Sequence, residues 1–299
     1  MKILITGVYG IIGSYLCQRL KENGHYIVGI GKREEYEKCH KYYSCDITNY
    51  NNLEKVLKEN KDIDIIIHAA ALAHNKGNDL SKESFIKINY EGTKNLIDLS
   101  NKCTNLKNFV FLSTISVYGE RLNIEEYKEY ETLLPKSPYA VAKKMSEEYI
   151  KSTCKSNYSI LRLAPVYSKD FKLNIQRRTS IKGIGYTVGK GEKNLSLCNI
   201  KNIYLSIDYI IKNYKDERNN IYNISASKTY SYKELLKYVN KKRVIVIPNF
   251  LMKALYNFNK AITKNVFIEE NSIKLLSNNT YPNDEINKKV KLKYNIEDD

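Results

Sequence analysis

A tyrosine and a lysine four residues apart are the first candidates for chemistry in this sequence. Tyr139 and Lys143 stand in the segment YAVAK, and a helix there would place both side chains on one face. A phenol can exchange a proton with a sugar oxygen, but its reference pKa of about 10 is too high for a base at neutral pH. A nearby ammonium group lowers that pKa. The pair therefore fits acid–base catalysis beside a hydride transfer.

Position along the chain, rather than spacing, selects this pair. Tyr139 follows Pro138 at the start of a helix-like segment, and it comes shortly after a strand-like segment that ends at Ser113 and Thr114. Open α/β sheets bind ligands at the carboxyl ends of strands, so the Thr114 hydroxyl could contact the same substrate oxygen as Tyr139. The same spacing recurs elsewhere without that context, at Tyr90/Lys94, Tyr186/Lys190, Tyr238/Lys242 and Tyr256/Lys260.

A glycine-rich turn near the amino terminus could hold the hydride carrier. The turn GVYGIIG follows an apolar strand-like segment at 2–6 and opens a segment with helical spacing at 11–23. Glycines let backbone amides approach a pyrophosphate, and a helix start adds free N–H groups and a positive dipole end. Strand, turn and helix in this order predict a dinucleotide site. Its expected contacts are Gly7, Gly10, Ile11, Ile12 and Gly13.

The end of the second strand bears on which dinucleotide binds. An acidic residue there would bond the ribose 2′-hydroxyl of NAD, but this chain has Lys32 and Arg33. Two cations suit the 2′-phosphate of NADP, so NADP is preferred. Glu34 and Glu35 follow directly, and they leave NAD open.

Strand-like and helix-like segments alternate through the first two thirds of the chain. The alternation predicts parallel β-α-β units in a doubly wound α/β sheet of the Rossmann type. After residue 164 the pattern becomes irregular, which predicts a second, smaller, interleaved α+β domain. We expect a dinucleotide-binding domain at 1–164 and about 195–226, and a substrate domain at about 165–194 and 227–299. Expected strands are 2–6, 26–30, 63–69, 109–113, 158–163 and 221–224; expected helices are 11–23, 53–59, 85–103, 139–155, 203–214 and 231–240.

Composition excludes several other classes of protein. Hydrophobic residues make up 42% of the 299 residues and charged residues 27%, as in an ordinary globular chain rather than a collagen, a disordered chain or a disulfide scaffold. The net charge of +16 comes from scattered cations with acids among them, so no nucleic-acid partner is expected. Six cysteines without a C-x-x-C pair predict no metal site. Neither a membrane-length apolar stretch nor a signal peptide is present, so we expect a cytoplasmic protein without a membrane partner.

Motifs in a fixed order along most of the chain give a resemblance. They are Thr6-Gly7-x-x-Gly10-x-x-Gly13, Asp46-Ile47, His68-Ala69-Ala70-Ala71, Asn89-x-x-Gly92-Thr93, Ser113-Thr114-x-x-Val117-Tyr118-Gly119, Pro138-Tyr139-x-x-x-Lys143 and Arg162-x-x-Pro165-Val166-Tyr167. The set resembles the extended short-chain dehydrogenase/reductase family, in particular its nucleotide-sugar epimerase/dehydratase branch. The resemblance implies a nucleotide-sugar substrate and a homodimer formed through the helices at 85–103 and 139–155.

The resemblance also implies roles for individual residues. Thr114, Tyr139 and Lys143 would carry the chemistry, and Lys143 would also hold the ribose and lower the tyrosine pKa. Ser116 would join Thr114 and Tyr139 in contacting the substrate. The implied cofactor contacts are Asp46 and Ile47 at the adenine, Ala69, Ala70 and Ala71 along the cofactor, Asn89 at the nicotinamide half, Pro165, and the catalytic Tyr139 and Lys143.

The sequence departs from the family pattern at two places. Dehydratases of the family carry an Asp-Glu pair directly after the threonine, where this chain has Ile115 and Ser116, so a 4,6-dehydratase is not expected. Pro165 and Leu195 stand where epimerases often have Asn and Arg contacts to the substrate diphosphate. Lys190, Lys193 or the pair Arg177 and Arg178 could replace those contacts, and the alternative is that these cations belong to a solvated basic loop.

These observations predict an NADPH-dependent reductase of a nucleotide-activated 4-keto sugar, with a hydride delivered to C4 and a proton from Tyr139. The alternative is a nucleotide-sugar 4-epimerase similar to UDP-glucose 4-epimerase, which would use the same residues. A third possibility is a non-catalytic NAD(P)-sensing protein, which would need the glycine turn but not the Thr114, Tyr139 and Lys143 set.

Overall fold

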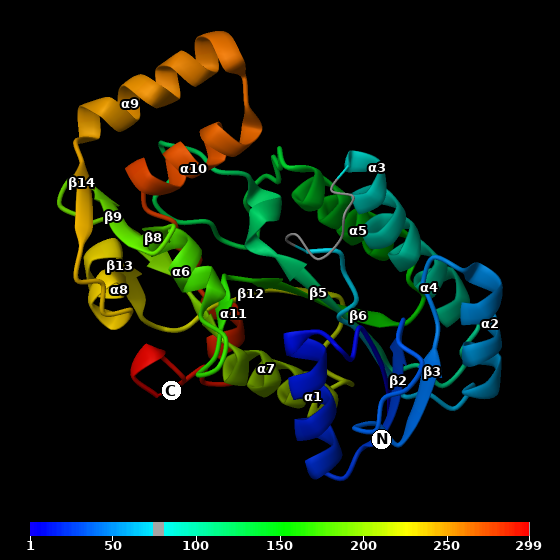
Figure 1. The fold of residues 1–299 in the computed structure, drawn as a ribbon. Helices are drawn as coiled ribbons and strands as arrows, with labels where there is room; N and C mark the ends of the chain where they lie inside the picture. Colours follow the sequence, from blue (N-terminus) through cyan, green and yellow to red (C-terminus); the bar gives the residue numbers. More distant parts are fainter. Residues whose placement is uncertain (74–80, 299) are drawn as a thin grey trace. The chain divides into compact units, whose positions relative to one another are not determined.

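The computed structural model describes residues 1–73 and 81–298. Its centre is a seven-stranded sheet of order β12-β6-β5-β4-β1-β2-β3 (Figure 1). The pairs β1–β2, β2–β3, β1–β4 and β4–β5 are parallel. Strand order reverses between β1 and β4, which is where doubly wound sheets bind ligands. The strands are β1 (Lys2–Thr6), β2 (Tyr26–Gly31), β3 (Lys41–Ser44), β4 (Ile65–His68), β5 (Asn108–Thr114), β6 (Asn157–Leu163) and β12 (Asn220–Ile224).

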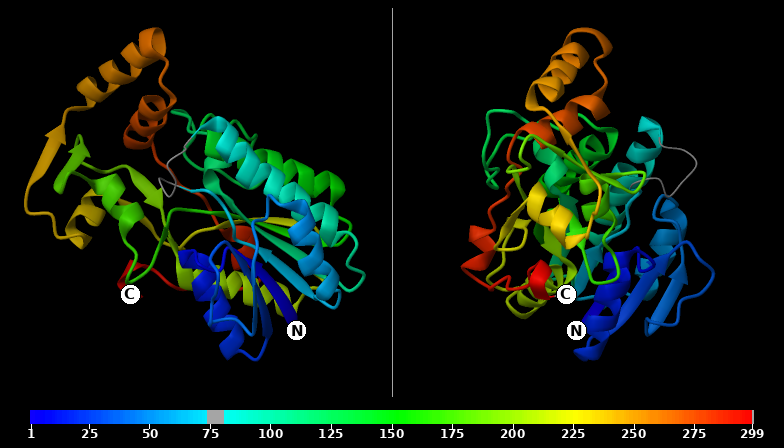
Figure 2. Two further views of the ribbon diagram at one scale, coloured as in Figure 1. Left: turned by 45° about the vertical axis from the view of Figure 1, so that its right-hand side comes forward. Right: turned by 60° about the vertical axis from the view of Figure 1, so that its left-hand side comes forward.

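Helices cover both faces of this sheet, as the expected Rossmann fold requires (Figures 1 and 2). On one face lie α1 (Ile11–Glu22) and α7 (Ile200–Lys212), where the Asn23 amide donates to the Tyr204 hydroxyl. On the other lie α2 (Tyr50–Glu59), α4 (Gly92–Ser100) and α5 (Pro138–Thr153). The strands alternate with these helices along the chain, so the expected α/β fold class is confirmed.

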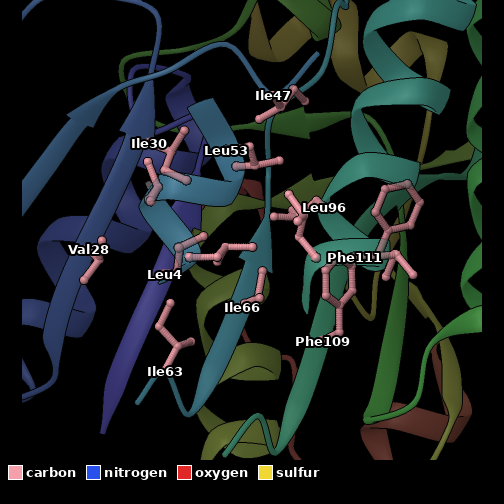
Figure 3. Close-up of a cluster of buried hydrophobic side chains, with 14 of the residues drawn as sticks. Leu4, Val28, Ile30, Ile47, Leu53, Ile63, Ile66, Leu96, Phe109 and Phe111 are labelled. Atoms are coloured by element: carbon pink, nitrogen blue, oxygen red, sulfur yellow. The ribbon is translucent and has the colours of Figure 1, made fainter. Parts of the chain in front are cut away.

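The core under α2, α4 and α5 explains why these strands are so apolar. Every residue of β4 is buried, because a parallel strand with helices on both faces has no side facing water. Leu4, Ile66 and Phe109, from adjacent strands, pack with Leu53 and Leu96 from the helices (Figure 3). Full burial of one such side chain contributes about 1.5–3 kcal/mol, so this cluster fixes the register of the strands.

One expected helix is divided. The segment predicted at 85–103 forms α3 (Lys82–Phe85), a π-helical turn η1 (Ile86–Glu91) and α4. The extra residue in the π turn shifts the helix phase around Asn89, and side-chain periodicity alone does not reveal such a shift. The other expected elements of the sheet region are present within a few residues of their predicted bounds, whereas β3 was not predicted.

Contacts divide the chain into two compact units. The first comprises 1–117, 138–162 and 204–222, and the second 118–137, 163–203 and 223–299. The predicted domain boundaries, which placed 118–137 with the sheet, remain a prediction. Within the described residues no helix has the length and apolarity needed to span a bilayer.

The second unit is built from short sheets and helices around its own core. That core contains Tyr167, Ile175, Leu195 and Tyr230, all nearly inaccessible. The elements are η2 (Ile115–Tyr118, which begins in the first unit), β7 (Val166–Tyr167), α6 (Leu173–Thr179), β8 (Ser180–Ile181), β9 (Ile184–Val188), β10 (Asn194–Ser196), β11 (Cys198–Asn199), β13 (Thr229–Ser231), α8 (Tyr232–Tyr238), β14 (Val244–Ile247), α9 (Asn249–Phe258), η3 (Asn259–Thr263), α10 (Val266–Leu276), α11 (Asp284–Asn287) and η4 (Ile296–Asp298).

Candidate active site

The glycine turn between β1 and α1 has the geometry of a phosphate-binding loop. Gly7 has a φ of +73°, and a Cβ added there would lie 2.7 Å from the Cα and N of Ala70. A Cβ added at Gly13 would lie 2.2 Å from the Gly7 carbonyl oxygen. Gly10 caps α1 without a side chain, so the first N–H groups of the helix remain available to a ligand. The turn therefore fits a pyrophosphate, with Gly7, Gly10, Ile11, Ile12 and Gly13 around it.

A buried histidine joins this turn to the neighbouring strand and helix. His68 lies with Nδ1 2.7 Å from Thr6 Oγ1 and with Nε2 2.9 Å from Thr93 Oγ1. Thr6 Oγ1 also accepts from the Ala70 N–H at 3.1 Å. Burial, with a smaller contribution from the Lys143 charge, lowers the pKa of His68 to about 3, so the ring is neutral. His68 thus holds the segment of Ala69 to Ala71 against the turn, a role that sequence reasoning did not assign.

Asn89 fixes the same segment from the helix side. Its Oδ1 accepts from the Leu72 N–H at 2.7 Å, and its Nδ2 donates to the Leu72 carbonyl at 3.1 Å. The Asn89 carbonyl accepts from the Thr93 and Ser146 hydroxyls, at 2.5 and 3.0 Å. Asn89 is buried, and both polar groups of its side chain are bonded to Leu72. Its predicted support of the nicotinamide half remains a prediction, but the contact that the structure shows is with the backbone beside Ala71.

The hydroxyls of Thr114 and Tyr139 meet at the carboxyl end of β5. Thr114 is the last residue of β5, Tyr139 is the second residue of α5, and the Thr114 side chain lies close enough to lower the Tyr139 pKa. The Ser116 N–H donates to Thr114 Oγ1 at 3.2 Å, and Thr114 Oγ1 donates to Ser116 Oγ at 3.4 Å. The edge of the Phe85 ring packs on the Tyr139 ring, with centroids 6.1 Å apart. Two proton-carrying groups are thus presented together.

Lys143 lies one turn further along α5 and is directed into the core. Its Nζ donates to the Leu112 carbonyl at 2.8 Å and lies 4.4 Å from the centroid of the Phe111 ring. Burial lowers the pKa of Lys143 to about 7, although the nearby Glu147 carboxylate raises it in part. The lysine can therefore gain or lose a proton near neutral pH.

The tyrosine pKa differs from the sequence expectation. Burial raises the pKa of Tyr139 to about 12, and the hydrogen bond with Thr114 offsets only part of that rise. Lys143 was expected to lower it, but the desolvation of the ring dominates. In this structure Tyr139 is therefore a proton donor at neutral pH, and it needs further positive charge beside it to become a base.

A buried ion pair supports α5, and sequence reasoning missed it. Arg162 of β6 donates to both carboxylate oxygens of Glu147, with Nη2 2.7 Å from Oε2. Ser113 Oγ donates to Glu147 Oε1 at 2.6 Å. Both charged side chains are almost fully buried. Glu147 thus ties α5 to β5 and β6, and its position four residues after Lys143 was the only signal in the sequence.

Asp46, the residue expected to contact the adenine, is paired with a cation. Burial raises the pKa of Asp46, but hydrogen bonds from Lys32 and Thr48 outweigh it and hold that pKa below its usual value. Lys32 Nζ lies 2.6 Å from Asp46 Oδ2. The Arg33 guanidinium stacks over the Tyr9 ring at 4.5 Å, beside the glycine turn. Ile47 is buried against Gly92.

The expected substrate-binding residues fall in both units. Thr114, Ser116 and Tyr139 belong to the first unit, as described above. Arg177 is exposed on α6, Lys190 and Lys193 are exposed on the turn between β9 and β10, and Pro165 precedes β7; all four belong to the second unit. Their roles toward substrate and cofactor remain predictions.

A known protein family matches most of this chain, including the residues of the candidate site. The model of the NAD dependent epimerase/dehydratase family matches residues 3–225. The chain belongs to that family. Its match includes the glycine turn, Thr114, Tyr139 and Lys143, and it ends before α8. The family suspected from the ordered motifs is therefore confirmed.

Curated relatives of the family match only part of their own length. A UDP-glucose 4-epimerase of Streptococcus mutans is 30% identical over 157 residues, which are 50% of this chain and 46% of that protein. A dTDP-D-glucose 4,6-dehydratase of Dictyostelium discoideum is 28% identical over 264 residues, 75% of this chain and 58% of that protein. The matches thus span about half the length of these relatives.

Solved structures share the fold. The UDP-glucuronic acid 4-epimerase of Bacillus cereus, in complex with UDP-glucuronic acid and NAD, superposes with a TM-score of 0.73 over 100% of this chain and 96% of that one, at 22% identity. The UDP-glucose 4-epimerase of Thermotoga maritima, with UDP-glucose, gives 0.69 over 83% and 86%, also at 22%. At this identity the likeness establishes the fold alone.

Proposed function

We propose that this protein is an NAD-dependent 4-epimerase of a UDP-hexose. The observation that carries the proposal is the closeness of the Thr114 side chain to the Tyr139 hydroxyl at the end of β5, in the same unit as the glycine turn. The residue pattern favoured a 4-keto reductase that uses the same residues. The names of the relatives and structural neighbours, which include several 4-epimerases, support the epimerase alternative.

The proposed reaction is an isomerisation with no net oxidation. Tyr139 removes the proton from the C4 hydroxyl while Thr114 holds that oxygen by a hydrogen bond, and C4 becomes a ketone. After the keto sugar has rotated to present its other face, Tyr139 would return a proton to the same oxygen as C4 is reduced again. Bound NAD supplies the hydride acceptor and, through its positively charged ring, lowers the Tyr139 pKa.

The residues around the turn fit the dinucleotide. Gly10 and the first turn of α1 would hold the pyrophosphate, Ala69 to Ala71 would lie along the cofactor, and Asp46 would take the adenine. NAD is proposed rather than the NADP first preferred, because the Lys32 charge is paired with Asp46 and the similar Bacillus cereus epimerase structure is a complex with NAD. Arg33 could still meet a 2′-phosphate, so the two cofactors are to be compared directly.

A dehydration is not proposed for this site. Loss of water across C5 and C6 of the sugar needs an acid and a base besides the tyrosine. The two residues after Thr114 are Ile115, which is buried, and Ser116, and neither carries a carboxylate. The site therefore offers groups for proton transfer at the C4 oxygen, but it lacks an acidic pair directly after Thr114.

Stoichiometry tests the proposal. Purified protein is incubated with UDP-glucose, UDP-galactose, UDP-glucuronic acid and a 4-keto nucleotide sugar, each with NAD or NADPH, and products and reduced cofactor are measured together. The expected result is interconversion of C4 epimers without net change in cofactor. One NADPH consumed per sugar would establish the reductase instead, and absence of any turnover across the panel would contradict both.

A further inference from the structure

A long segment of the second unit exposes apolar side chains that no part of the described chain covers. On β14, an edge strand paired only with β9, Val244, Ile245 and Val246 are all exposed. The following helix α9 packs on α10 and buries Met252. Figures 1 and 2 show α9 continuing from the end of β14. The family match ends at residue 225, so this segment lies outside it.

The exposed side chains of α9 and η3 form a continuous stripe. Leu251, Leu255, Phe258 and Ile262 follow one another at intervals of four, three and four residues, which places them on one face of the helix. All are exposed, and Phe250 and Phe267 beside them are 68% and 74% exposed. An amphipathic helix normally buries its apolar stripe, but here the stripe faces outward.

The same segment carries only positive charge. Residues 241–268 contain no Asp or Glu and six cations, namely Lys241, Lys242, Arg243, Lys253, Lys260 and Lys264. No described carboxylate forms an ion pair with Lys253, Lys260 or Lys264. The acids that follow are already engaged, because Glu269 pairs with Lys136 and Glu270 lies near Lys274. The segment therefore has exposed aliphatic and aromatic groups on one face of α9 and unneutralised cations, of which Lys253 and Lys260 lie on the opposite face of the helix.

We infer that residues 241–268 dock this protein on the surface of an anionic lipid bilayer. The apolar stripe would enter the interface between headgroups and acyl chains, while the lysine stems bring their charges to lipid phosphates. Each such cation near an anionic surface adds to the electrostatic attraction. A second copy of the chain fits less well, because a symmetric contact would bring six cations against six with no acid between them. This inference does not depend on the proposed catalytic activity.

The test is sedimentation of the full chain with vesicles. One set is phosphatidylcholine alone, and the other contains about one third phosphatidylglycerol. We expect binding to the anionic vesicles, little binding to the neutral ones, and release at high salt. Leu255→Ser with Phe258→Ser should abolish binding. The matched control is Leu122→Ser with Tyr130→Ser, two exposed apolar residues of the same unit outside the segment, which should bind as the parent does.

Charge-reversal variants measure the electrostatic contribution to vesicle binding. Lys253→Glu with Lys260→Glu should weaken binding at least about tenfold, whereas Lys21→Glu with Lys215→Glu, the same change of net charge elsewhere on the surface, should have a much smaller effect. Thermal unfolding of each variant verifies that it is folded. Failure to bind anionic vesicles, or equal loss in test and control variants, overturns the inference. A dimer in sedimentation velocity that Leu255→Ser with Phe258→Ser dissociates would assign the surface to a second copy instead.

Discussion

At the residue scale, the catalytic helix holds a lysine in a place that does not suit a charge. Lys143 is only 2% exposed, and burial lowers its pKa to about 7 from 10.5. An unfolded lysine keeps its proton up to about pH 10, so between these values the unfolded chain binds more protons than the folded one. The free energy of unfolding therefore falls as the pH drops from about 10 to about 7, and below 7 the destabilisation by this group is complete.

Replacing this lysine should stabilise the ligand-free protein. We expect Lys143→Met to raise the free energy of unfolding by on the order of 2 kcal/mol at about pH 6, after allowance for the lost bond to the Leu112 carbonyl. The gain should shrink as pH rises toward 10, while turnover is lost. Denaturant unfolding at several pH values measures this. A variant less stable than the parent at every pH would show that the lysine is charged and satisfied in the core.

Breaking the nearby ion pair between Arg162 and Glu147 should instead lower the free energy of unfolding. Arg162→Met leaves the buried Glu147 carboxylate without its partner, and we expect a loss of about 3–5 kcal/mol of unfolding free energy. Arg162→Met combined with Glu147→Leu should recover most of that loss, because neither member of the pair is then left buried without the other. Chemical denaturation of both variants measures the difference. A single variant as stable as the parent would contradict the role of the pair in supporting α5.

The residues proposed for chemistry could be predicted from the sequence, whereas the buried ion pair could not. Tyr139, Lys143 and Thr114 were found because their types and order match a chemistry. Glu147 and Arg162 were missed, since a buried ion pair between α5 and β6 depends on a tertiary contact that spacing does not encode. The raised pKa of Tyr139 was missed for the same reason, because burial is a property of the folded surroundings.

At the element scale, the turn between β1 and α1 depends on two glycines for different reasons. Gly7 needs its positive φ, whereas Gly13 needs the absence of a Cβ. Gly13→Ala should displace the turn and weaken NAD affinity at least about tenfold, measured by calorimetry. Gly24→Ala is the control, because its φ is +79° with no atom within 4 Å of an added Cβ. It should cost about 1 kcal/mol in stability and leave the affinity unchanged; the reverse pattern would contradict the assigned role of the turn.

Sequence reasoning was more successful for some elements than for others. Strands such as β1 and β4 were predicted because continuous apolar runs bounded by turns are typical of buried parallel strands. The π turn around Asn89 was not, because side-chain periodicity does not reveal the inserted residue, and the bonds that Asn89 accepts from Leu72, Thr93 and Ser146 depend on the fold. The short strands of the second unit and the outward stripe of α9 also escaped prediction, since an amphipathic pattern does not say which way its apolar face points.

At the scale of the whole molecule, the expected homodimer remains to be tested. Tyr90 and Tyr149, from the two helical segments expected to form the interface, pack edge to face with centroids 6.2 Å apart, and Lys94 lies over the Tyr149 ring. Both tyrosines are partly exposed. We expect a dimer in sedimentation velocity at micromolar concentration, and a monomer for Tyr90→Glu. A monomeric parent protein would rule out this assembly.

Turnover of Tyr139→Phe tests the central claim most directly. With the epimer pair identified, we predict that this variant loses about 10²–10⁴-fold in kcat while its NAD affinity changes little, because only the proton-carrying hydroxyl is removed. Tyr90→Phe, which has the same spacing to a lysine, should turn over at the parent rate. Turnover by Tyr139→Phe equal to that of the parent would contradict the account.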